Sequence, residues 1–338
     1  MPADEAKRPV LSVVVPCFDE QEVLPEFHRR LASAMNGIGL DWDVLYVNDG
    51  SRDRTLLVIQ DLAAQDPRIG WLNLSRNFGK EAALTAGLDH ALGSGGVVVI
   101  DADLQDPPEV IPNLVAAWGE GIDMAYARRR RREGDGPMKR LTATLFYRLI
   151  SRVGHRVEIP EDSGDFRLIS RRALDALLEL REHHRFMKGL FAWVGFSSRA
   201  VLYDRAPRAA GSTKWNYWSL WNFAIEGITG FSVLPLKIST YVGLLVAFGA
   251  LIFGLQLIAR TLLFGNPIPG YPSIMAVVLF LGGVQLITLG VIGEYLGRIA
   301  NESKRRPLYV VERFAPAVSA APTPRHANGP GAAFRESA

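Results

Sequence analysis

Short apolar runs alternate with helical patterns over the first 127 residues of the chain. Apolar, β-branched runs typical of buried strands occupy 11–15, 43–47, 69–74, 97–100 and 124–127. Between them, apolar residues recur at helical spacing over 23–35, 56–64 and 80–92. Strands separated by helices of this length predict parallel βαβ units. We therefore expect an α/β domain built on a mostly parallel, Rossmann-like sheet.

Polar residues gather directly after three of these predicted strands. The segments are PCFDE at 16–20, NDGSRD at 48–53 and DADLQD at 101–106. Ligands of open parallel sheets bind beyond the carboxyl ends of the strands. The pattern therefore predicts a binding site formed by these three segments together.

The middle of the chain, 128–236, shows no clear alternation of strands and helices. It contains five consecutive arginines, Arg128 to Arg132, and three tryptophans at helical spacing, Trp215, Trp218 and Trp221. Aromatic residues placed in this way are typical of an amphipathic helix at a membrane surface. We therefore expect this part of the chain to contact a lipid bilayer.

Two long apolar runs follow, with 27 residues from Ile238 to Phe264 and 25 residues from Ser273 to Gly297. At about 1.5 Å per residue, either run can span a hydrocarbon core of roughly 30 Å. The linker between them carries no Lys or Arg, whereas Lys237 precedes the first run and Arg298 and Lys304 to Arg306 follow the second. The positive-inside rule predicts a hairpin in the cytoplasmic membrane, with both termini and the large domain in the cytoplasm.

These patterns divide the chain into eight segments. We expect an N-terminal tail, an α/β domain, a lid with interfacial helices, a first membrane helix, an external loop, a second membrane helix, a basic cytoplasmic flank and a disordered tail. In the same order, these segments are 1–9, 10–204, 205–236, 237–264, 265–272, 273–299, 300–314 and 315–338.

Composition narrows the setting of the protein. A net charge of +3 is nearly balanced, so we expect no general affinity for nucleic acid. The single cysteine, Cys17, excludes an intramolecular disulfide and a multi-cysteine metal site, as is usual in a reducing compartment. The polar start of the chain does not resemble a signal peptide, so we expect its first part to stay in the cytosol.

Asp101 and Asp103 are the residues with the clearest chemical implication. Carboxylates at i and i+2 beyond a strand can direct hard oxygen ligands to one point, which suits Mg²⁺ or Mn²⁺ better than zinc. Such a metal usually completes its shell with substrate phosphates. The alternative is that both residues cap the helix predicted near Pro108, but Asp106 is better placed for that. The sequence therefore favours a site for a metal and a diphosphate.

Seven motifs are distinctive when taken together: VVPCFDEQEVLP, VNDGSRDRT, LSRNFGKEAALTAGLD, DADLQDPPEVIP, GDFRLISRRAL, FMKGLFAWVGF and FLGGVQLITLGVIGEYLGR. They resemble the family 2 glycosyltransferases with a GT-A fold, and among them the polyprenyl-phosphate glycosyltransferases. The likeness covers residues 10 to about 312, and the terminal hairpin is similar to that of the bactoprenol branch.

The resemblance implies a role for each residue that matches a family motif. Asp49 would contact the base or ribose of the nucleotide, beside a Gly50 turn that allows close backbone approach. Asp103 would ligate the metal directly, with Asp101 on the nucleotide sugar or the metal shell and Gln105 near the donor sugar. The full nucleotide-sugar set implied is Pro16, Asp19, Glu20, Asp49, Ser51, Asp101 and Gln105. Family members often have Tyr-Asn where this chain has Phe18 and Asp19, so the tyrosine hydroxyl is absent here.

Asp165 matches the family's catalytic base, which would complete a catalytic set with Asp101 and Asp103. A lipid phosphate monoester has a second pKa near 6, however, so at neutral pH the nucleophile is already largely an oxyanion. Asp165 could equally orient the acceptor, the donor sugar or the metal, and the sequence leaves both roles open. Cationic side chains would neutralise the two phosphate groups, with a lid at GSTK. The candidates are Arg128, Arg140, Arg167, Arg205, Arg208 and Lys214.

The reaction implied is inverting, metal-dependent transfer of a sugar from a nucleotide-sugar donor to polyprenyl phosphate at the cytoplasmic membrane face. UDP-glucose is the donor favoured, with GDP-mannose, UDP-N-acetylglucosamine and a UDP-arabinose derivative as alternatives. A processive polysaccharide synthase is less favoured, because the chain lacks a Gln-x-x-Arg-Trp motif. A non-catalytic membrane module for lipid-linked sugars is the alternative from another class. The resemblance also implies a homotetramer.

Overall fold

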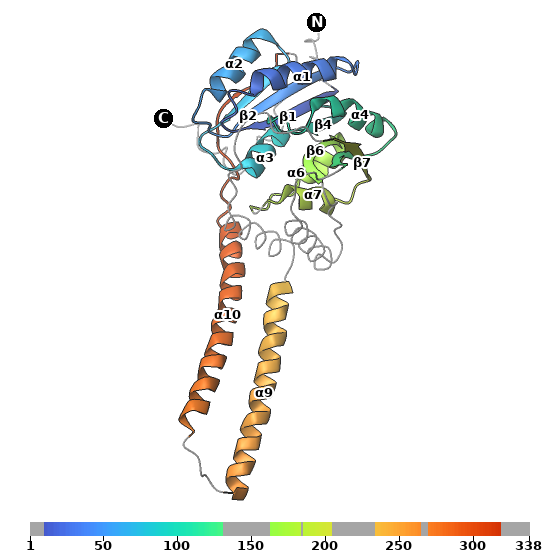
Figure 1. The fold of residues 1–338 in the computed structure, drawn as a ribbon. Coiled ribbons are helices and arrows are strands. Elements are labelled where there is room, and N and C mark those ends of the chain that lie inside the picture. The colour runs from blue at the N-terminus through green and yellow to red at the C-terminus, as the bar shows by residue number, and fades with distance from the viewer. Residues whose placement is uncertain (1–9, 131–162, 184, 205–233, 265–269, 319–338) are drawn as a thin grey trace, which may run out of the picture.

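The protein consists of an α/β unit and two long helices that project from it side by side (Figure 1). The computed structural model describes residues 10–130, 163–183, 185–204, 234–264 and 270–318. The predicted lid and interfacial tryptophans at 205–233, the arginines from Arg131 on and most of the external loop lie outside the described residues.

An eight-stranded sheet forms the centre of the α/β unit, in the order β7-β5-β6-β4-β1-β2-β3-β8. The four central strands β4, β1, β2 and β3 are parallel neighbours, whereas β6 runs antiparallel to β4 and β5, and β8 antiparallel to β3. The strands are β1 Leu11–Cys17, β2 Trp42–Asn48, β3 Ile69–Leu74, β4 Gly96–Val99, β5 Met124–Arg129, β6 Ser163–Ser170, β7 Ser198–Tyr203 and β8 Val311–Ala315. The mostly parallel α/β sheet predicted from the sequence is confirmed.

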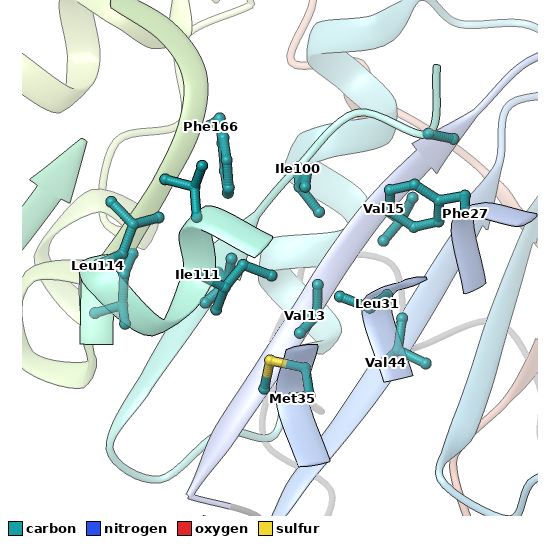
Figure 2. Packing of buried hydrophobic residues seen from close by; sticks show 14 of the residues in the cluster. Val13, Val15, Phe27, Leu31, Met35, Val44, Ile100, Ile111, Leu114 and Phe166 are labelled. Carbon is teal, nitrogen blue, oxygen red and sulfur yellow. The ribbon is translucent and has the colours of Figure 1, made fainter. Parts of the chain in front are cut away.

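Helices cover both faces of the sheet. α1 buries Leu24, Phe27, Leu31 and Met35, whose i, i+3, i+4 spacing forms one apolar stripe against the sheet. Figure 2 shows this stripe packed on strand residues such as Val13. The helices on this face are α1 Leu24–Asn36, α2 Thr55–Gln65 and α4 Ile111–Gly119, which follows the short turn η1 Pro108–Val110. Those on the other face are α3 Lys80–His90, α6 Arg171–Leu178 and α7 Met187–Trp193.

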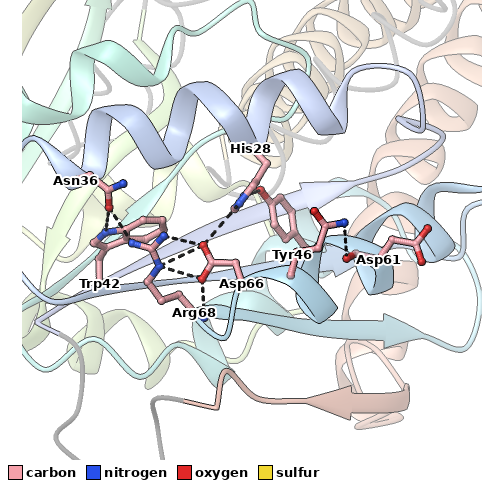
Figure 3. Close-up of polar contacts among 8 residues, drawn as sticks. His28, Asn36, Trp42, Tyr46, Asp61, Asp66 and Arg68 are labelled. Atoms are coloured by element: carbon pink, nitrogen blue, oxygen red, sulfur yellow. Dashed lines mark hydrogen bonds and ion pairs between the residues drawn. The ribbon is translucent and has the colours of Figure 1, made fainter.

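A polar cluster fastens α1 to the strands beneath it (Figure 3). His28 Nδ1 lies 3.0 Å from the Tyr46 hydroxyl, and its Nε2 lies 3.9 Å from an Asp66 carboxylate oxygen. Asp66 in turn accepts hydrogen bonds from Arg68, whose guanidinium lies 4.2 Å from the centre of the Trp42 ring. Burial lowers the pKa of His28, so the imidazole is neutral at pH 7 and acts here as a packing residue.

The long helices are α9 Leu234–Phe264 and α10 Tyr271–Ser303. Both are long and apolar enough to cross a membrane, judged by length and composition. In each helix, no residue of the most apolar segment is buried inside the protein. Side chains such as Leu244 and Leu286 are about 70% exposed. Exposed apolar surface of this extent needs an apolar environment. The predicted hairpin is therefore present, although each helix starts earlier, and α10 ends later, than the sequence predicts.

The C-terminal part of the α/β unit differs from the prediction. Residues 300–314 were expected to be only a basic flank, but Val311–Ala315 forms β8 at the edge of the sheet. The predicted tail boundary at 315 is also wrong, because Ala317 is 3% exposed and the Val318 N–H donates to the Pro67 carbonyl. β8 escaped prediction because its sequence, VERFA, has no apolar alternation. Residues 319–338 lie outside the described part of the chain.

Candidate functional site

The segments after β1, β2 and β4 meet at one edge of the sheet, as predicted, because these strands are parallel neighbours. The antiparallel strand β6 brings Asp165 to the same edge. Val99 pairs with Arg167 in the β4–β6 ladder, so two residues further on Asp101 comes opposite Asp165. The structure therefore joins two predicted catalytic carboxylates that are 64 positions apart in the sequence.

Lys80 links these two carboxylates, although no pattern in the sequence singled it out. Its ammonium Nζ lies 2.6 Å from Asp101 Oδ2 and 2.8 Å from Asp165 Oδ2. Lys80 is the first residue of α3, after Gly79 at φ 98°. A cation at a helix N-terminus opposes the helix dipole, so its position needs another explanation. That unfavourable placement is the signal from which a functional lysine could have been suspected.

The charges around Asp165 keep it ionised. Burial raises the pKa of this carboxyl group, but the nearby ammonium groups of Lys80 and Lys188 outweigh burial and hold its pKa at about 2. Burial lowers the pKa of Lys188, which lies on α7 close to Asp165. Asp165 Oδ1 is buried and has no hydrogen-bond partner among the described residues. A buried acceptor in this state is suited to receive a hydrogen bond from a bound substrate.

Arg167 lies beneath Asp165 rather than in the open site. Its guanidinium donates to the carbonyl oxygens of Gly164 and Asp165 and stacks 3.8 Å from the centre of the Phe191 ring. Burial lowers its pKa to about 10, which still leaves it protonated at pH 7. Because only 6% of the residue is exposed, Arg167 is better placed to support the Asp165 strand than to contact a diphosphate. Contact of Arg167 with a diphosphate stays a prediction that its burial does not favour.

The predicted nucleotide residues form a connected set at the ends of β1 and β2. Ser51 Oγ accepts a hydrogen bond from the Asp19 backbone N–H at 3.1 Å, and Asp19 Oδ1 accepts one from the Arg52 N–H at 2.8 Å. The Glu20 N–H donates to Thr55 Oγ1 at 2.8 Å. These bonds hold the first two polar segments together, with Pro16 at the end of β1 beside them.

Asp49 has a structural task at this edge. Its two carboxylate oxygens accept the backbone N–H groups of Phe78 and Gly79 at 2.7 and 2.9 Å, and 3% of the residue is exposed. Asp49 thereby fixes the loop that leads into Lys80. Next to it, a Cβ on Gly50 would lie 2.4 Å from the backbone carbon of Arg76, so the glycine lets these two backbone segments pack closely. Close approach of a nucleotide to Gly50 stays a prediction. Contact of Asp49 with a base or ribose stays a prediction.

Two residues at the site adopt the left-handed backbone conformation without being glycine. Asp19 has φ 56° and Leu104 has φ 58°. This backbone conformation is sterically unfavourable for leucine, and residues adopt it only where the surrounding structure imposes it. Leu104 is 5% exposed and lies between Asp103 and Gln105. Its conformation therefore sets the direction of the side chains on both sides of it.

Asp101 and Asp103 fit a divalent metal only together with other ligands. The described residues hold no group of three or more His, Cys, Asp or Glu side chains suited to a metal ion. Asp101 Oδ2 is paired with Lys80, and Asp103 Oδ1 accepts the Gln105 N–H at 3.1 Å. Two carboxylates are nevertheless what Mg²⁺ commonly receives from a protein when substrate phosphates and water complete the shell.

Asp106, which the sequence analysis favoured over Asp101 and Asp103 as the cap of the helix near Pro108, does not cap a helix. The turn η1 begins after Pro107, and no side chain caps it. Asp106 instead accepts a hydrogen bond from the Tyr203 hydroxyl, and the Arg129 guanidinium lies 3.9 Å away. The carboxylate thus joins the β4 segment to β5 and β7.

The predicted cationic residues are only partly described. Arg128 is exposed on β5 and alternates with Arg129, which points towards Asp106. A contact between Arg128 and a phosphate stays a prediction. The remaining candidates, Arg140, Arg205, Arg208 and Lys214, lie outside the described residues. Lys80 and Lys188 are cations of the site that the sequence analysis did not include.

Two family models match the chain. Residues 12–178 match the glycosyl transferase family 2 model, and residues 234–299 match the GtrB C-terminal hairpin model. The first match contains the three polar segments and Asp165, and the second contains most of α9 and α10. The sheet edge that carries the polar segments and the two long helices therefore both have counterparts in described families.

Individual relatives are similar along nearly their whole length. An uncharacterised glycosyltransferase from Synechocystis is 50% identical over 89% of this chain and 94% of its own. The bactoprenol glucosyl transferase of Shigella phage SfV is 48% identical over 89% and 98%, and the prophage homologue of Escherichia coli 47% over 90% and 98%. Among solved structures, a mannosyltransferase from Pyrobaculum calidifontis, in complex with GDP-Man and Mn²⁺, shares 16% identity, with a TM-score of 0.43, over 90% of this chain and 77% of that one.

The two family models and the long matches lead to one assignment. Relatives that are close to half identical over nine tenths of the chain share its fold and its family. The chain is therefore a glycosyltransferase and belongs to glycosyl transferase family 2.

Proposed function

We propose that this glycosyltransferase moves a sugar from a nucleotide-sugar donor to polyprenyl phosphate, with inversion at the anomeric carbon. The observation that carries the proposal is the contact of Lys80 with both Asp101 and Asp165, beside the nucleotide segments. A cation between two carboxylates suits a site in which a diphosphate and an anionic acceptor meet, and this supports the proposal. The bactoprenol glucosyl transferases among the relatives support a polyprenyl acceptor and glucose as the sugar.

In the proposed reaction, an acceptor phosphate oxygen attacks the anomeric carbon while the bond from that carbon to the diphosphate oxygen breaks. The nucleoside diphosphate leaves with the bonding electron pair. Lys80 is placed to neutralise part of the charge that collects on the leaving group. Asp165, ionised and with a buried free oxygen, is placed to accept a hydrogen bond from the donor sugar and orient it.

A divalent ion, Mg²⁺ or Mn²⁺, belongs to this proposal. Asp103 and Asp101 would hold it, and when bound it would supply positive charge to the diphosphate. Asp101 Oδ2 is paired with Lys80, so holding an ion with both oxygens would require Asp101 to give up that pairing. Lys80 would then keep its contact with Asp165 and be available to the phosphate groups.

The setting proposed is the cytoplasmic face of the membrane. The two exposed apolar helices carry the α/β unit at one end of the hairpin (Figure 1). The basic residues that follow α10 favour the cytoplasm for that end. A polyprenyl acceptor cannot leave the bilayer, so an enzyme fixed to the membrane meets it within two dimensions. Assembly into a tetramer is part of the proposal that rests on resemblance alone.

The direct test uses the full chain in detergent with Mn²⁺ and undecaprenyl phosphate. UDP-glucose, GDP-mannose, UDP-N-acetylglucosamine and a UDP-arabinose derivative are offered separately. We expect transfer of one sugar, reduced at least about 100-fold in Asp103→Asn and in Lys80→Met. Arg199→Ala, a change at an exposed residue on β7, is the matched control and should keep full activity.

A folded protein that transfers none of the four sugars would contradict the proposal. Full activity in Lys80→Met would contradict the role given to this lysine while leaving the reaction intact. Retention of a normal thermal unfolding temperature in both variants separates lost chemistry from lost folding.

A further inference from the structure

β8 brings the chain back to the catalytic sheet after the second long helix. It pairs antiparallel with β3 along its whole length, and the bonds continue past both of its ends. The Ser75 N–H donates to the Val310 carbonyl at 3.0 Å, and the Val318 N–H donates to the Pro67 carbonyl at 2.9 Å. A Cβ on Gly70 would lie 2.9 Å from the Ala317 nitrogen, so the segment is closely packed.

A β-bulge in this pairing turns the Glu312 side chain. Asn73 pairs with Arg313, and the next residue of β3 pairs with Val311, so Glu312 is the extra residue. Val311 packs with the cluster on the α3 face, and the Phe314 ring lies 4.9 Å from that of His90 on α3. Strict alternation would point residues 312 and 314 to the same face. The bulge instead lets Glu312 reach Asn73, whose Nδ2 donates to its Oε2 at 2.5 Å.

From Glu312, side-chain hydrogen bonds continue to the nucleotide segments. Asn48 Nδ2 donates to Asn73 Oδ1 at 2.6 Å, and Ser51 Oγ donates to Asn48 Oδ1 at 2.5 Å. Ser51 Oγ accepts the Asp19 N–H at 3.1 Å. We call this series, Glu312–Asn73–Asn48–Ser51–Asp19, the β8 relay. It crosses the carboxyl ends of β3, β2 and β1, and its two asparagines are 8% and 2% exposed.

The direction of the β8 relay follows from its first member. A carboxylate can only accept hydrogen bonds, so Asn73 must offer it the NH₂ side of its amide and turn its oxygen to Asn48. Asn48 then has to offer NH₂ to Asn73 and its oxygen to Ser51. The Ser51 hydroxyl donates to that oxygen, which leaves a lone pair for the Asp19 N–H. Without Glu312, nothing among these contacts forces either buried amide into one orientation.

We infer that Glu312 is a positioning residue for the donor nucleotide, acting through the β8 relay on the loop that holds Asp19 and Ser51. The inference rests on the proposed function, because it takes these two residues as part of the nucleotide site. It adds a residue far outside the α/β domain predicted from the sequence. It also means that the segment following the membrane hairpin helps to order the donor site.

The test compares Glu312→Ala, Glu312→Gln and Arg313→Ala in the full-length protein. Arg313 is the exposed neighbour on the same strand and makes no side-chain hydrogen bond or ion pair with the described residues. Binding of UDP and of GDP in the presence of Mn²⁺ is measured by calorimetry. We expect Glu312→Ala to weaken binding of the preferred nucleotide about 5- to 10-fold, and Arg313→Ala to leave it unchanged. Glu312→Gln keeps one acceptor oxygen, so its loss of nucleotide affinity, on a logarithmic scale, should be at most half of the loss in Glu312→Ala.

Two further readouts separate positioning from simple support of the fold. In Glu312→Ala, KM for the donor should rise while kcat at saturating donor stays within about two-fold. In the absence of nucleotide, amide hydrogen exchange should become faster at Asp19 and over residues 48–53. Without the Glu312 carboxylate, the hydrogen bonds that hold these backbone segments are no longer fixed in one arrangement. Neither change is expected in Arg313→Ala.

Three results would overturn the inference. Unchanged nucleotide binding in Glu312→Ala would show that the β8 relay does not reach the site. Equal weakening in Glu312→Ala and Arg313→Ala, with a lower unfolding temperature in both, would show that β8 acts only as support. Failure of the unaltered protein to bind either nucleotide would contradict the proposed function, and the inference with it.

Discussion

Lys80 determines the charge balance of the catalytic edge. Asp101 and Asp165 come opposite each other across β4 and β6, where two unpaired carboxylates would repel. The ammonium between them removes that repulsion and favours ionisation of Asp165. A permanently ionised carboxylate is a good hydrogen-bond acceptor, but it is a weak base at neutral pH. The geometry therefore favours the orienting role for Asp165 among the two roles that the sequence leaves open.

This role predicts a specific pH dependence. The acceptor phosphate loses its second proton near pH 6, so kcat/KM should rise through about pH 6 and then level off. The pKa of Asp165, at about 2, lies below this range, so the residue contributes no rising limb. We expect Asp165→Asn to lower kcat/KM roughly 10- to 100-fold between pH 5 and 8 without changing the shape of the profile. If the rise of kcat/KM with pH is present in the unaltered protein but absent in Asp165→Asn, Asp165 is the general base.

Asp43 is a buried carboxylate away from the site, and it makes stability depend on pH. Burial raises its pKa to about 6, although it accepts a hydrogen bond from Ser12 Oγ at 2.5 Å. A raised folded-state pKa means that the native protein loses stability as pH rises from about 4 to 6, by up to about 3 kcal/mol. We expect Asp43→Asn to raise the unfolding temperature at pH 7 but not at pH 4.

The measurement for Asp43 is thermal unfolding at both pH values. Asp61→Asn, a change at an exposed aspartate on α2, is the matched control and should have no effect at either pH. An equal rise in the unfolding temperature of Asp43→Asn at both pH values would show that ionisation of Asp43 is not the cause of the stabilisation.

At the scale of elements, the sequence predicts those strands and helices that have a regular local pattern of apolar residues. The five strands predicted from 11 to 127 and the helices α1, α2 and α3 match within about two residues, because each is a regular apolar pattern between turn residues. The helix expected near Pro108 begins instead at Ile111, after a short turn. β6, β7 and β8 escaped prediction because they pair antiparallel or at the sheet edges, with partners distant in sequence. Lys80 escaped for the same reason, since its two partners belong to β6 and to the segment after β4. The three polar segments, in contrast, could be placed together from the sequence, because they follow strands that were predicted to be parallel.

β8 is held by side chains as well as by its ladder. The Tyr309 hydroxyl donates to Asp89 Oδ2 at 2.7 Å, and the same oxygen lies 2.9 Å from the Arg181 guanidinium. We expect Tyr309→Phe to loosen the segment by about 1 kcal/mol, so that trypsin cleaves after Arg313 roughly five-fold faster. Tyr241→Phe, a change at an exposed residue on α9, is the matched control. Equal cleavage rates in the two variants would contradict a fastening role for Tyr309.

At the scale of the whole molecule, the proposed insertion of the hairpin puts the α/β unit on the cytoplasmic side of the membrane. The single native cysteine, Cys17, is 2% exposed, so it gives little background in a labelling experiment. We expect Asn266→Cys, between the long helices, to react with a membrane-impermeant maleimide on intact cells. Asn301→Cys, near the end of α10, should react only after the cells are opened. Labelling in the reverse pattern would invert the proposed orientation.

The position of β8 also orders events during synthesis. The ribosome makes the first seven strands before the hairpin, but the strand that covers the edge of β3 is made only after both long helices. Until then β3 presents unpaired backbone groups, which invite association with other chains. The sheet is therefore completed only once the hairpin has been translated. With the hairpin inserted as proposed, completion of the sheet and arrival at the membrane are parts of one sequence of events.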